Sequence, residues 1–217
     1  MNIIITMAGI GRRFREAGFL MPKYMIEAHG KSLFEWSMES LAGFSNRDNT
    51  YYFIVRSEDH ASGFIKEACK KLGIDNCVVI EPDRRTDGQA STAMLAADHW
   101  KEEDSLLIYN IDTFVEAGEM NESQIEGDGF IPCFHAEGDH WSFVELDDEG
   151  RAMRVKEKER ISDNCTLGAY YFRTAALYRE LYREYYEEGL FDRSCDSSAE
   201  QKEKYVAPLY NYLIQRG

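Results

Sequence analysis

The first half of the chain alternates short apolar runs with segments in which apolar residues recur at helical spacing. Short runs rich in β-branched or aromatic residues indicate buried strands, and the longer spacing indicates helices. The predicted strands are 2–6, 51–55, 77–80 and 106–109, and the predicted helices are 33–41, 59–72 and 90–100. A capping box formed by Ser32 and Glu35 predicts where the first helix begins, and Gly73 predicts where the second ends. This alternation predicts an α/β fold with a Rossmann-like mixed, mostly parallel sheet and helices on both faces.

The pattern changes after Asp112. Further strands are predicted at 130–134, 141–146, 152–157 and 167–172, with turn residues at 147–150. A helix rich in tyrosine and glutamate is predicted at 174–188 and a last helix at 206–214, whereas the polar segment 192–204 fits either a loop or a weak helix. There is no internal repeat and no low-complexity linker. We therefore expect one domain over residues 1–217, made of an α/β half, 1–112, and a mixed half, 113–217.

The charge of the chain is unevenly distributed. The net charge of −14 argues against a general nucleic-acid surface, which needs a basic face. The first 31 residues are locally basic, however, with more cations than anions: Arg12, Arg13, Arg15, Lys23 and Lys31 against Glu16 and Glu27. One basic loop in an acidic protein suggests a small polyanionic ligand.

No apolar run approaches the roughly 20 residues that span a bilayer, so no membrane partner is expected. The N-terminus lacks the basic region of a secretory signal. The cysteines at 69, 77, 133, 165 and 195 are scattered without CxxC spacing. They indicate reduced thiols of a cytoplasmic protein, neither a disulfide framework nor a zinc site.

Three loops are expected to meet at one edge of the sheet. In open parallel sheets ligands bind beyond the carboxyl ends of the strands, which places the Gly9 loop, the 86–89 loop and Asp112 together. Gly9 and Gly11 leave room for backbone N–H groups to approach phosphate oxygens. Cationic side chains of the same stretch can add charge-assisted hydrogen bonds to those oxygens.

Two common phosphate-binding patterns do not fit. A dinucleotide-binding GxGxxG would need a small residue where Phe14 stands. A Walker A loop ending at Gly30-Lys31-Ser32 would need a glycine where Met25 stands, and Ser32 is better explained as a helix cap.

The chain instead resembles the nucleotidylyltransferases, or pyrophosphorylases, that activate sugar phosphates and related phosphate esters with a nucleoside triphosphate. Five stretches carry the resemblance, in the same order as in that family. They are Met7-Ala8-Gly9-Ile10-Gly11-Arg12-Arg13-Phe14 with Pro22-Lys23, Asp87-Gly88-Gln89-Ala90-Ser91-Thr92, Tyr109-Asn110-Ile111-Asp112, Val155-Lys156-Glu157-Lys158, and Leu167-Gly168-Ala169-Tyr170-Tyr171-Phe172. The Pro-Lys-Tyr-Met stretch and Tyr210-Asn211 are most similar to the cell-surface polysaccharide type, some of whose members use CTP.

The resemblance implies a nucleotide-diphospho-sugar transferase fold, with a nucleotide-binding half at 1–112 and an acceptor-binding half at 113–217. It also implies transfer of a nucleotidyl group from an NTP, with CTP favoured, to a small phosphorylated acceptor, with release of pyrophosphate. Mg²⁺ would be the cofactor, and the protein would be a monomer or homodimer.

The resemblance also assigns roles to residues. Arg13 and Lys23 would be catalytic, and Asp112 would hold Mg²⁺. The nucleotide would be bound by Ala8, Gly9, Gly11, Arg12, Gly88 and Gln89. The acceptor would be bound by Glu157, Lys158 and Gly168. Because neighbouring strand residues point to opposite faces, at most one of Glu157 and Lys158 is expected to enter a given pocket through the strand itself.

The sequence departs from the family at two points. The first loop has one glycine fewer than the usual A-G-G-x-G, with arginine at position 12. Many members also carry a second metal-binding carboxylate late in the chain; here Asn211 or a nearby acid would substitute, or the segment is missing, or activity is weak.

Two other function classes stay open. A glycosyltransferase of the same fold would prefer D-x-D where Asn110-Ile111-Asp112 stands. A nucleotide-binding homologue without turnover is the second.

Overall fold

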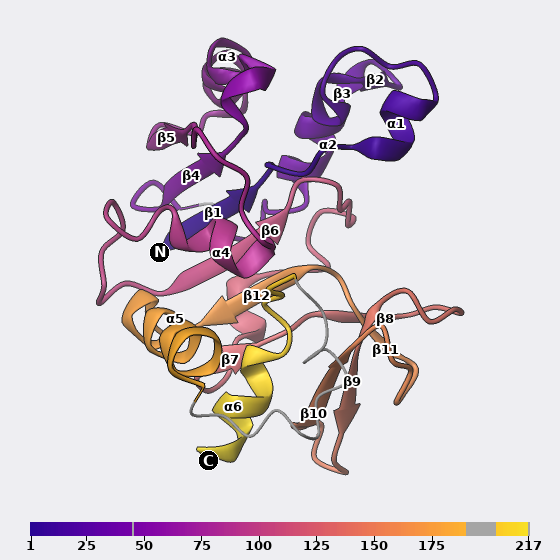
Figure 1. Cartoon of the computed structure of the whole chain (residues 1–217), viewed down its shortest axis with the longest axis vertical. Helices are drawn as coiled ribbons and strands as arrows, with labels where there is room; N and C mark the ends of the chain where they lie inside the picture. The colour runs from indigo at the N-terminus through magenta and orange to yellow at the C-terminus, as the bar shows by residue number, and fades with distance from the viewer. Residues whose placement is uncertain (45, 190–202, 217) are drawn as a thin grey trace.

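The computed structural model describes residues 1–44, 46–189 and 203–216. At its centre is a six-stranded sheet (Figure 1). Its strands lie in the order β5 (Cys77–Ile80), β4 (Thr50–Ile54), β1 (Asn2–Thr6), β6 (Leu106–Asn110), β12 (Ala169–Phe172) and β7 (Gly129–Phe130). The pairs from β5 to β6 are parallel, whereas β12 is antiparallel to both of its neighbours, β6 and β7. The predicted mixed, mostly parallel sheet is therefore confirmed.

Helices cover both faces of this sheet because its strands are apolar on both sides. Ile3 and Ile5 of β1 share a core with α2 (Leu33–Glu39) and α3 (Ser62–Leu72). Ile4 faces the opposite core, which contains α4 (Gln89–Met94), α5 (Ala175–Tyr182) and α6 (Leu209–Gln215). The predicted capping box is present at Ser32, and Gly73 ends α3 in a left-handed conformation.

A second, four-stranded antiparallel sheet lies beside the first (Figure 1). Its order is β10 (Ala152–Glu157), β9 (Ser142–Leu146), β11 (Asn164–Thr166) and β8 (Cys133–His135). The remaining elements are short: α1 (Arg12–Glu16), the hairpin of β2 (Glu27–Ala28) and β3 (Lys31–Ser32), 3₁₀ turns at Lys23–Met25, Ser57–Asp59 and Glu122–Gln124, and a π turn at Arg183–Glu188. None of the helices in the described ranges is long and apolar enough to cross a membrane.

Several predicted elements of the second half are shorter than expected. The strand predicted at 130–134 is divided between β7 and β8, because Pro132 lies in it and cannot donate to a ladder. The strand predicted at 167–172 begins only at Ala169, after Gly168 with a φ of 78°. The helix predicted at 206–214 begins at Leu209, directly after Pro208.

Two predicted helices change their hydrogen bonding before they end. The one predicted at 90–100 is α-helical only to Met94, beyond which turns with hydrogen bonds from residue i+3 to residue i continue to His99. The one predicted at 174–188 becomes a π turn at Arg183. Most of the polar segment predicted at 192–204, including Cys195, lies outside the described residues.

Candidate active site

A cavity of about 550 Å³ opens where β1 and β6 end side by side, Thr6 pairing with Asn110. The loop after β1, the residues after β6 and the loop before α4 all line it, so the predicted convergence of these three loops is observed. Of the residues predicted for the nucleotide, catalysis and metal, it is lined by Ala8, Gly9, Gly11, Arg12, Lys23, Gly88, Gln89 and Asp112.

The glycine loop presents bare backbone to this cavity. Gly11 has a φ of 62°, a left-handed conformation that glycine adopts without strain, and its carbonyl accepts from the N–H groups of Phe14 and Arg15. Within the described part of the chain, the N–H groups of Gly9 and Gly11 donate to no protein acceptor. These two donors are thus available to a ligand in the cavity.

Lys23 and Asp112 form an ion pair on the cavity wall. The lysine Nζ lies 2.5 Å from Asp112 Oδ2. Pro22, with a φ of −55°, starts the turn that carries the lysine. The Lys23 side chain is 18% exposed and that of Asp112 56% exposed, so the lysine is held by the fold while the carboxylate is open to a ligand.

The three arginines of α1 differ in their partners and in their position relative to the cavity. Arg12 lines the cavity and pairs with Glu16 at 2.7 Å. Arg15 lies 4.0 Å from Asp59. Arg13 is exposed and is not among the lining residues, and its side chain makes no hydrogen bond or ion pair with residues 1–44, 46–189 or 203–216.

Residues 203–206, which we call the strap, pack against the loop before α4. The Lys204 N–H donates to the Asp87 carbonyl at 2.7 Å, and the Lys204 carbonyl accepts from the Ala90 N–H at 2.9 Å. Gly88 permits this contact, because a Cβ there would lie 2.3 Å from the Lys204 oxygen. Gln89 donates to the Asn110 side chain at 2.7 Å, which joins this loop to the end of β6.

A second cavity, of about 340 Å³, adjoins the first. Glu157 and Gly168 line it, as predicted for an acceptor site, and the two cavities share the wall residues Gln89, Asn110, Asp112 and Tyr205. Gly168 is required because a Cβ there would lie 2.5 Å from Asn110 Nδ2.

Lys158 approaches the shared wall from outside the strand. β10 ends at Glu157, and Lys158 has a φ of 56°. Its Nζ donates to the Tyr205 hydroxyl at 2.6 Å and lies 3.8 Å from Glu157 Oε1. Burial and the Glu203 carboxylate raise the pKa of Tyr205, so its hydroxyl stays protonated near neutral pH.

Asn211 does not lie at the site. Its amide accepts from the Val155 N–H and donates to the Val155 carbonyl, both at 2.8 Å. Glu203, an acidic residue that precedes Asn211 in the chain, lines the first cavity. Sequence reasoning also missed Thr6, Arg85, Trp141, Tyr170 and Tyr205. Tyr205, which belongs to the strap, has no motif that could have identified it.

The residues present fit Mg²⁺ bound together with a polyphosphate. Mg²⁺ in such sites usually takes one or two carboxylates, with phosphate oxygens and water completing its shell. Asp112 and Glu203 are the carboxylates among the described lining residues. No cluster of three or more His, Cys, Asp or Glu side chains suited to a metal is found in the described ranges, so phosphate oxygens would have to supply the other ligands.

Known structures resemble the whole chain. A structure described as the nucleoside-diphosphate-sugar pyrophosphorylase from Vibrio cholerae RC9 is 36% identical with a TM-score of 0.85, and the match covers 100% of this chain and 88% of that one. The inositol-1-phosphate CTP transferase from T. maritima shares the fold, with a TM-score of 0.76 at 14% identity over 100% of this chain and 82% of that one. No protein-family model and no curated protein matches the chain. The similarity to the Vibrio protein shows that the chain belongs to the nucleoside-diphosphate-sugar pyrophosphorylase family of nucleotidyltransferases.

Proposed function

We propose that this protein transfers a nucleotidyl group from a nucleoside triphosphate, CTP first among the candidates, to a small phosphorylated acceptor and releases pyrophosphate. The observation that carries the proposal is the pair of adjoining cavities with Asp112 in their common wall. Such a transfer needs the donor phosphate and the acceptor phosphate side by side. One cavity is bordered by bare backbone donors and a lysine, as a triphosphate requires, and the other is large enough for a small ester.

In the reaction, an oxygen of the acceptor phosphate forms a bond to the α-phosphorus of the NTP. The bond from that phosphorus to its bridging oxygen breaks, and the electron pair leaves with pyrophosphate. The protein contributes mainly position and charge neutralisation. Residues 1–112 would bind the nucleotide and residues 113–217 the acceptor.

Each predicted residue has a role in this scheme. Gly9 and Gly11 donate to the phosphates beside Ala8 and Arg12, while Gly88 and Gln89 contact the base. Lys23 reaches the α-phosphate from its position beside Asp112. Arg13 neutralises the departing pyrophosphate, which requires its exposed side chain to turn toward the cavity mouth.

The acceptor side uses the second cavity. Glu157 and Gly168 contact the acceptor, and Lys158 holds its phosphate at the wall shared by the two cavities. Mg²⁺, held by Asp112 when bound, would supply Lewis-acid stabilisation of the phosphate charge. Surface polysaccharide precursor synthesis in the cytoplasm is the biological setting that the resemblance favours.

Pyrophosphate release tests the proposal. Each NTP is combined with a panel of sugar phosphates, amino-alcohol phosphates and other phosphate esters. Lys23→Ala is expected to lower kcat about 100-fold or more, because it removes a charge that acts on the transferred phosphate. Arg13→Ala is expected to lower kcat as well.

Lys31→Ala is the matched control. Lys31 belongs to the same basic stretch but pairs with Glu39 at 2.6 Å, outside the two cavities. Unchanged turnover in both Lys23→Ala and Arg13→Ala at saturating substrates would refute the assigned roles. NTP binding without pyrophosphate release from any acceptor would favour a binding protein, and turnover of a sugar nucleotide instead would favour a glycosyltransferase.

A further inference from the structure

The second cavity has several aromatic side chains in its walls. His140, Trp141, Tyr170 and Tyr205 all line it. They come from three separate parts of the chain: the approach to β9, strand β12 and the strap. Aromatic faces attract a cation electrostatically, and most strongly when water is excluded.

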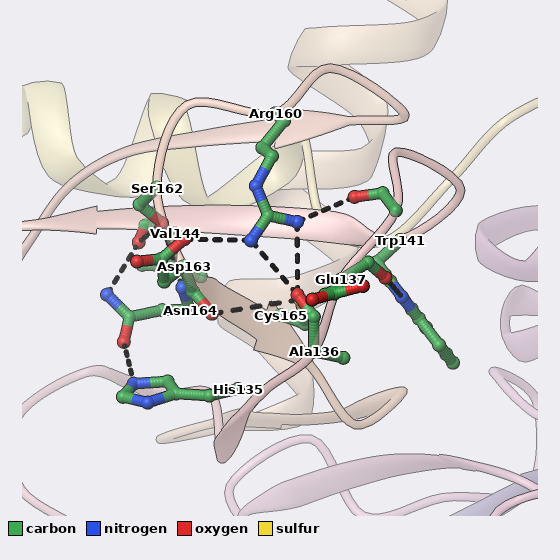
Figure 2. Close-up of polar contacts among 11 residues, drawn as sticks. His135, Ala136, Glu137, Trp141, Val144, Arg160, Ser162, Asp163, Asn164 and Cys165 are labelled. Carbon is green, nitrogen blue, oxygen red and sulfur yellow. Dashed lines mark hydrogen bonds and ion pairs between the residues drawn. The ribbon is translucent and has the colours of Figure 1, made fainter.

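Trp141 is held in place by a network that lies outside the cavity (Figure 2). Its indole N–H donates to the Glu137 carbonyl at 3.3 Å, and its ring meets Phe134 edge to face at 5.0 Å. The guanidinium of Arg160 donates to the Ala136 carbonyl at 3.0 Å. In Figure 2 the indole points away from Arg160. The ring packs against His140 at 4.6 Å as well as Phe134, and Trp141 still lines the second cavity.

A buried carboxylate lies within the same walls. The side chain of Glu157 is 9% exposed and accepts a hydrogen bond from the Ser142 hydroxyl. Lys158 Nζ is 3.8 Å from the other carboxylate oxygen and donates to the hydroxyl of Tyr205, a residue of the wall shared by the two cavities, although Lys158 itself is not among the lining residues of either. A carboxylate thus stands inside the aromatic walls, and an ammonium group stands beside Tyr205 of the shared wall.

Many polar donors of this cavity are already engaged within the protein. Thr113 donates to the Leu167 carbonyl at 3.0 Å, and Gln89 donates to Asn110 at 2.7 Å. Ser142 donates to Glu157, and the hydroxyls of Thr166 and Tyr170 pair at 3.1 Å. A buried hexose would need partners for several hydroxyl groups, and each one left unpaired costs affinity. The walls therefore favour a ligand that carries few hydroxyl groups and a positive charge.

We propose that the acceptor is a zwitterionic amino-alcohol phosphate. Its ammonium group packs against Trp141 and Tyr170 beside Glu157, and its phosphate faces Lys158 at the wall shared with the nucleotide cavity. The two charges of such an ester match the opposite charges of Glu157 and Lys158. This inference rests on the proposed function, because it names the acceptor for that nucleotidyl transfer and leaves the bonds made and broken unchanged.

The experiment compares acceptors with and without an ammonium group. Pyrophosphate release is measured with each NTP in turn and with phosphocholine, phosphoethanolamine or the 1-phosphates of glucose, galactose and mannose. The expected result is a kcat/KM for at least one amino-alcohol phosphate about 100-fold above that for any hexose phosphate, as expected for a charged contact supported by aromatic walls.

Two variants test the residues that recognise the ammonium. Glu157→Gln keeps the shape and one acceptor oxygen but replaces the other oxygen with an NH₂ donor and removes the charge, and is expected to raise KM for the amino-alcohol phosphate about 10- to 100-fold. Trp141→Leu is expected to raise it about 5- to 30-fold. Glu145→Gln, a change of the same charge on β9 outside the cavity, is expected to leave KM unchanged.

The possible failures are distinguishable. Turnover of a hexose phosphate but of no amino-alcohol phosphate would overturn this inference and leave the proposed function intact. An unchanged KM in Glu157→Gln would also overturn it. If a variant folds poorly, calorimetric titration of the wild-type protein with phosphocholine, in the presence of Mg²⁺ and a non-hydrolysable CTP analogue, decides: no binding refutes the inference. Absence of pyrophosphate release with every acceptor and every NTP would refute the proposed function itself.

Discussion

Replacing Asn211 separates a structural role from a role at the metal. β10 lies at the edge of the four-stranded sheet, and the Asn211 amide pairs with both backbone groups of Val155 at 2.8 Å. Val155 is fully buried. Asn211→Ala leaves the backbone N–H and carbonyl of Val155 without these side-chain partners, and each unpaired buried group costs about 1–3 kcal/mol. We therefore expect the free energy of unfolding to fall by about 2–6 kcal/mol, which for a chain of this size, at about 2–4 °C for each kcal/mol, lowers Tm by roughly 4–24 °C.

Urea unfolding followed by circular dichroism measures this loss, and Mg²⁺ titration of pyrophosphate release measures any loss at the metal. Gln215→Ala, on an exposed position of the same helix, is the control and should change neither quantity. Asn211→Asp distinguishes the two roles by sign. As a partner of Val155, the aspartate loses the donor and places a charge against a carbonyl, so the protein is destabilised. As a metal ligand, it would lower the Mg²⁺ concentration needed for activity. Unchanged stability in Asn211→Ala with a raised Mg²⁺ requirement would refute the reasoning.

Three further changes have expected outcomes. Tyr205→Phe removes the hydroxyl that accepts a hydrogen bond from Lys158 Nζ at 2.6 Å. Steady-state kinetics should therefore show a KM for the acceptor raised about 3- to 10-fold, while the thermal midpoint of unfolding changes little. Gly168→Ala forces a side chain into a φ of 78° and to within 2.5 Å of the Asn110 amide, so calorimetry should show a loss of about 1–3 kcal/mol, and the KM for both substrates should rise. Hydrogen bonds from the Lys71 side chain and from the backbone N–H of Ser32 lower the pKa of Glu35 from 4.5 to about 2. Glu35→Gln should therefore destabilise the protein near pH 7, and urea unfolding should show this difference shrinking as the pH falls from about 4.5 toward 2.

The strands and the first loops were predictable because local rules determine them. The apolar run at Cys77–Ile80 and the segment Ala152–Glu157 were both predicted as strands and coincide with β5 and β10. The Ser32 capping box forms because its two partners are three residues apart in the chain. The meeting of the glycine loop with Asp112 followed from strand order alone, since parallel neighbours end at the same edge.

The acceptor side could not be predicted in the same way. Glu157, the last residue of β10, lines the second cavity, whereas Lys158 follows the strand, so alternation along the strand does not decide between the two. The direction of Lys158 depends on its left-handed backbone after the strand ends, which no periodicity encodes. Tyr205 comes from a strap that is placed by backbone contacts with Asp87 and Ala90, so its position follows from tertiary packing and not from local pattern.

Asp112 lies where the proposed metal-binding role would bring it near both the nucleotide and the acceptor. It lines both cavities and is paired with Lys23 at 2.5 Å. While that pair is intact the two charges neutralise each other, which keeps the lysine directed at the wall between donor and acceptor. A triphosphate brings more negative charge to the lysine than one carboxylate offers, and a divalent cation brings more positive charge to Asp112 than the lysine does. If Lys23 and Asp112 have the proposed roles, binding of nucleotide with Mg²⁺ would separate the pair and turn both groups toward the phosphates. Nucleotide without a divalent cation would leave Asp112 uncompensated beside the phosphates, so its affinity should be the lower of the two.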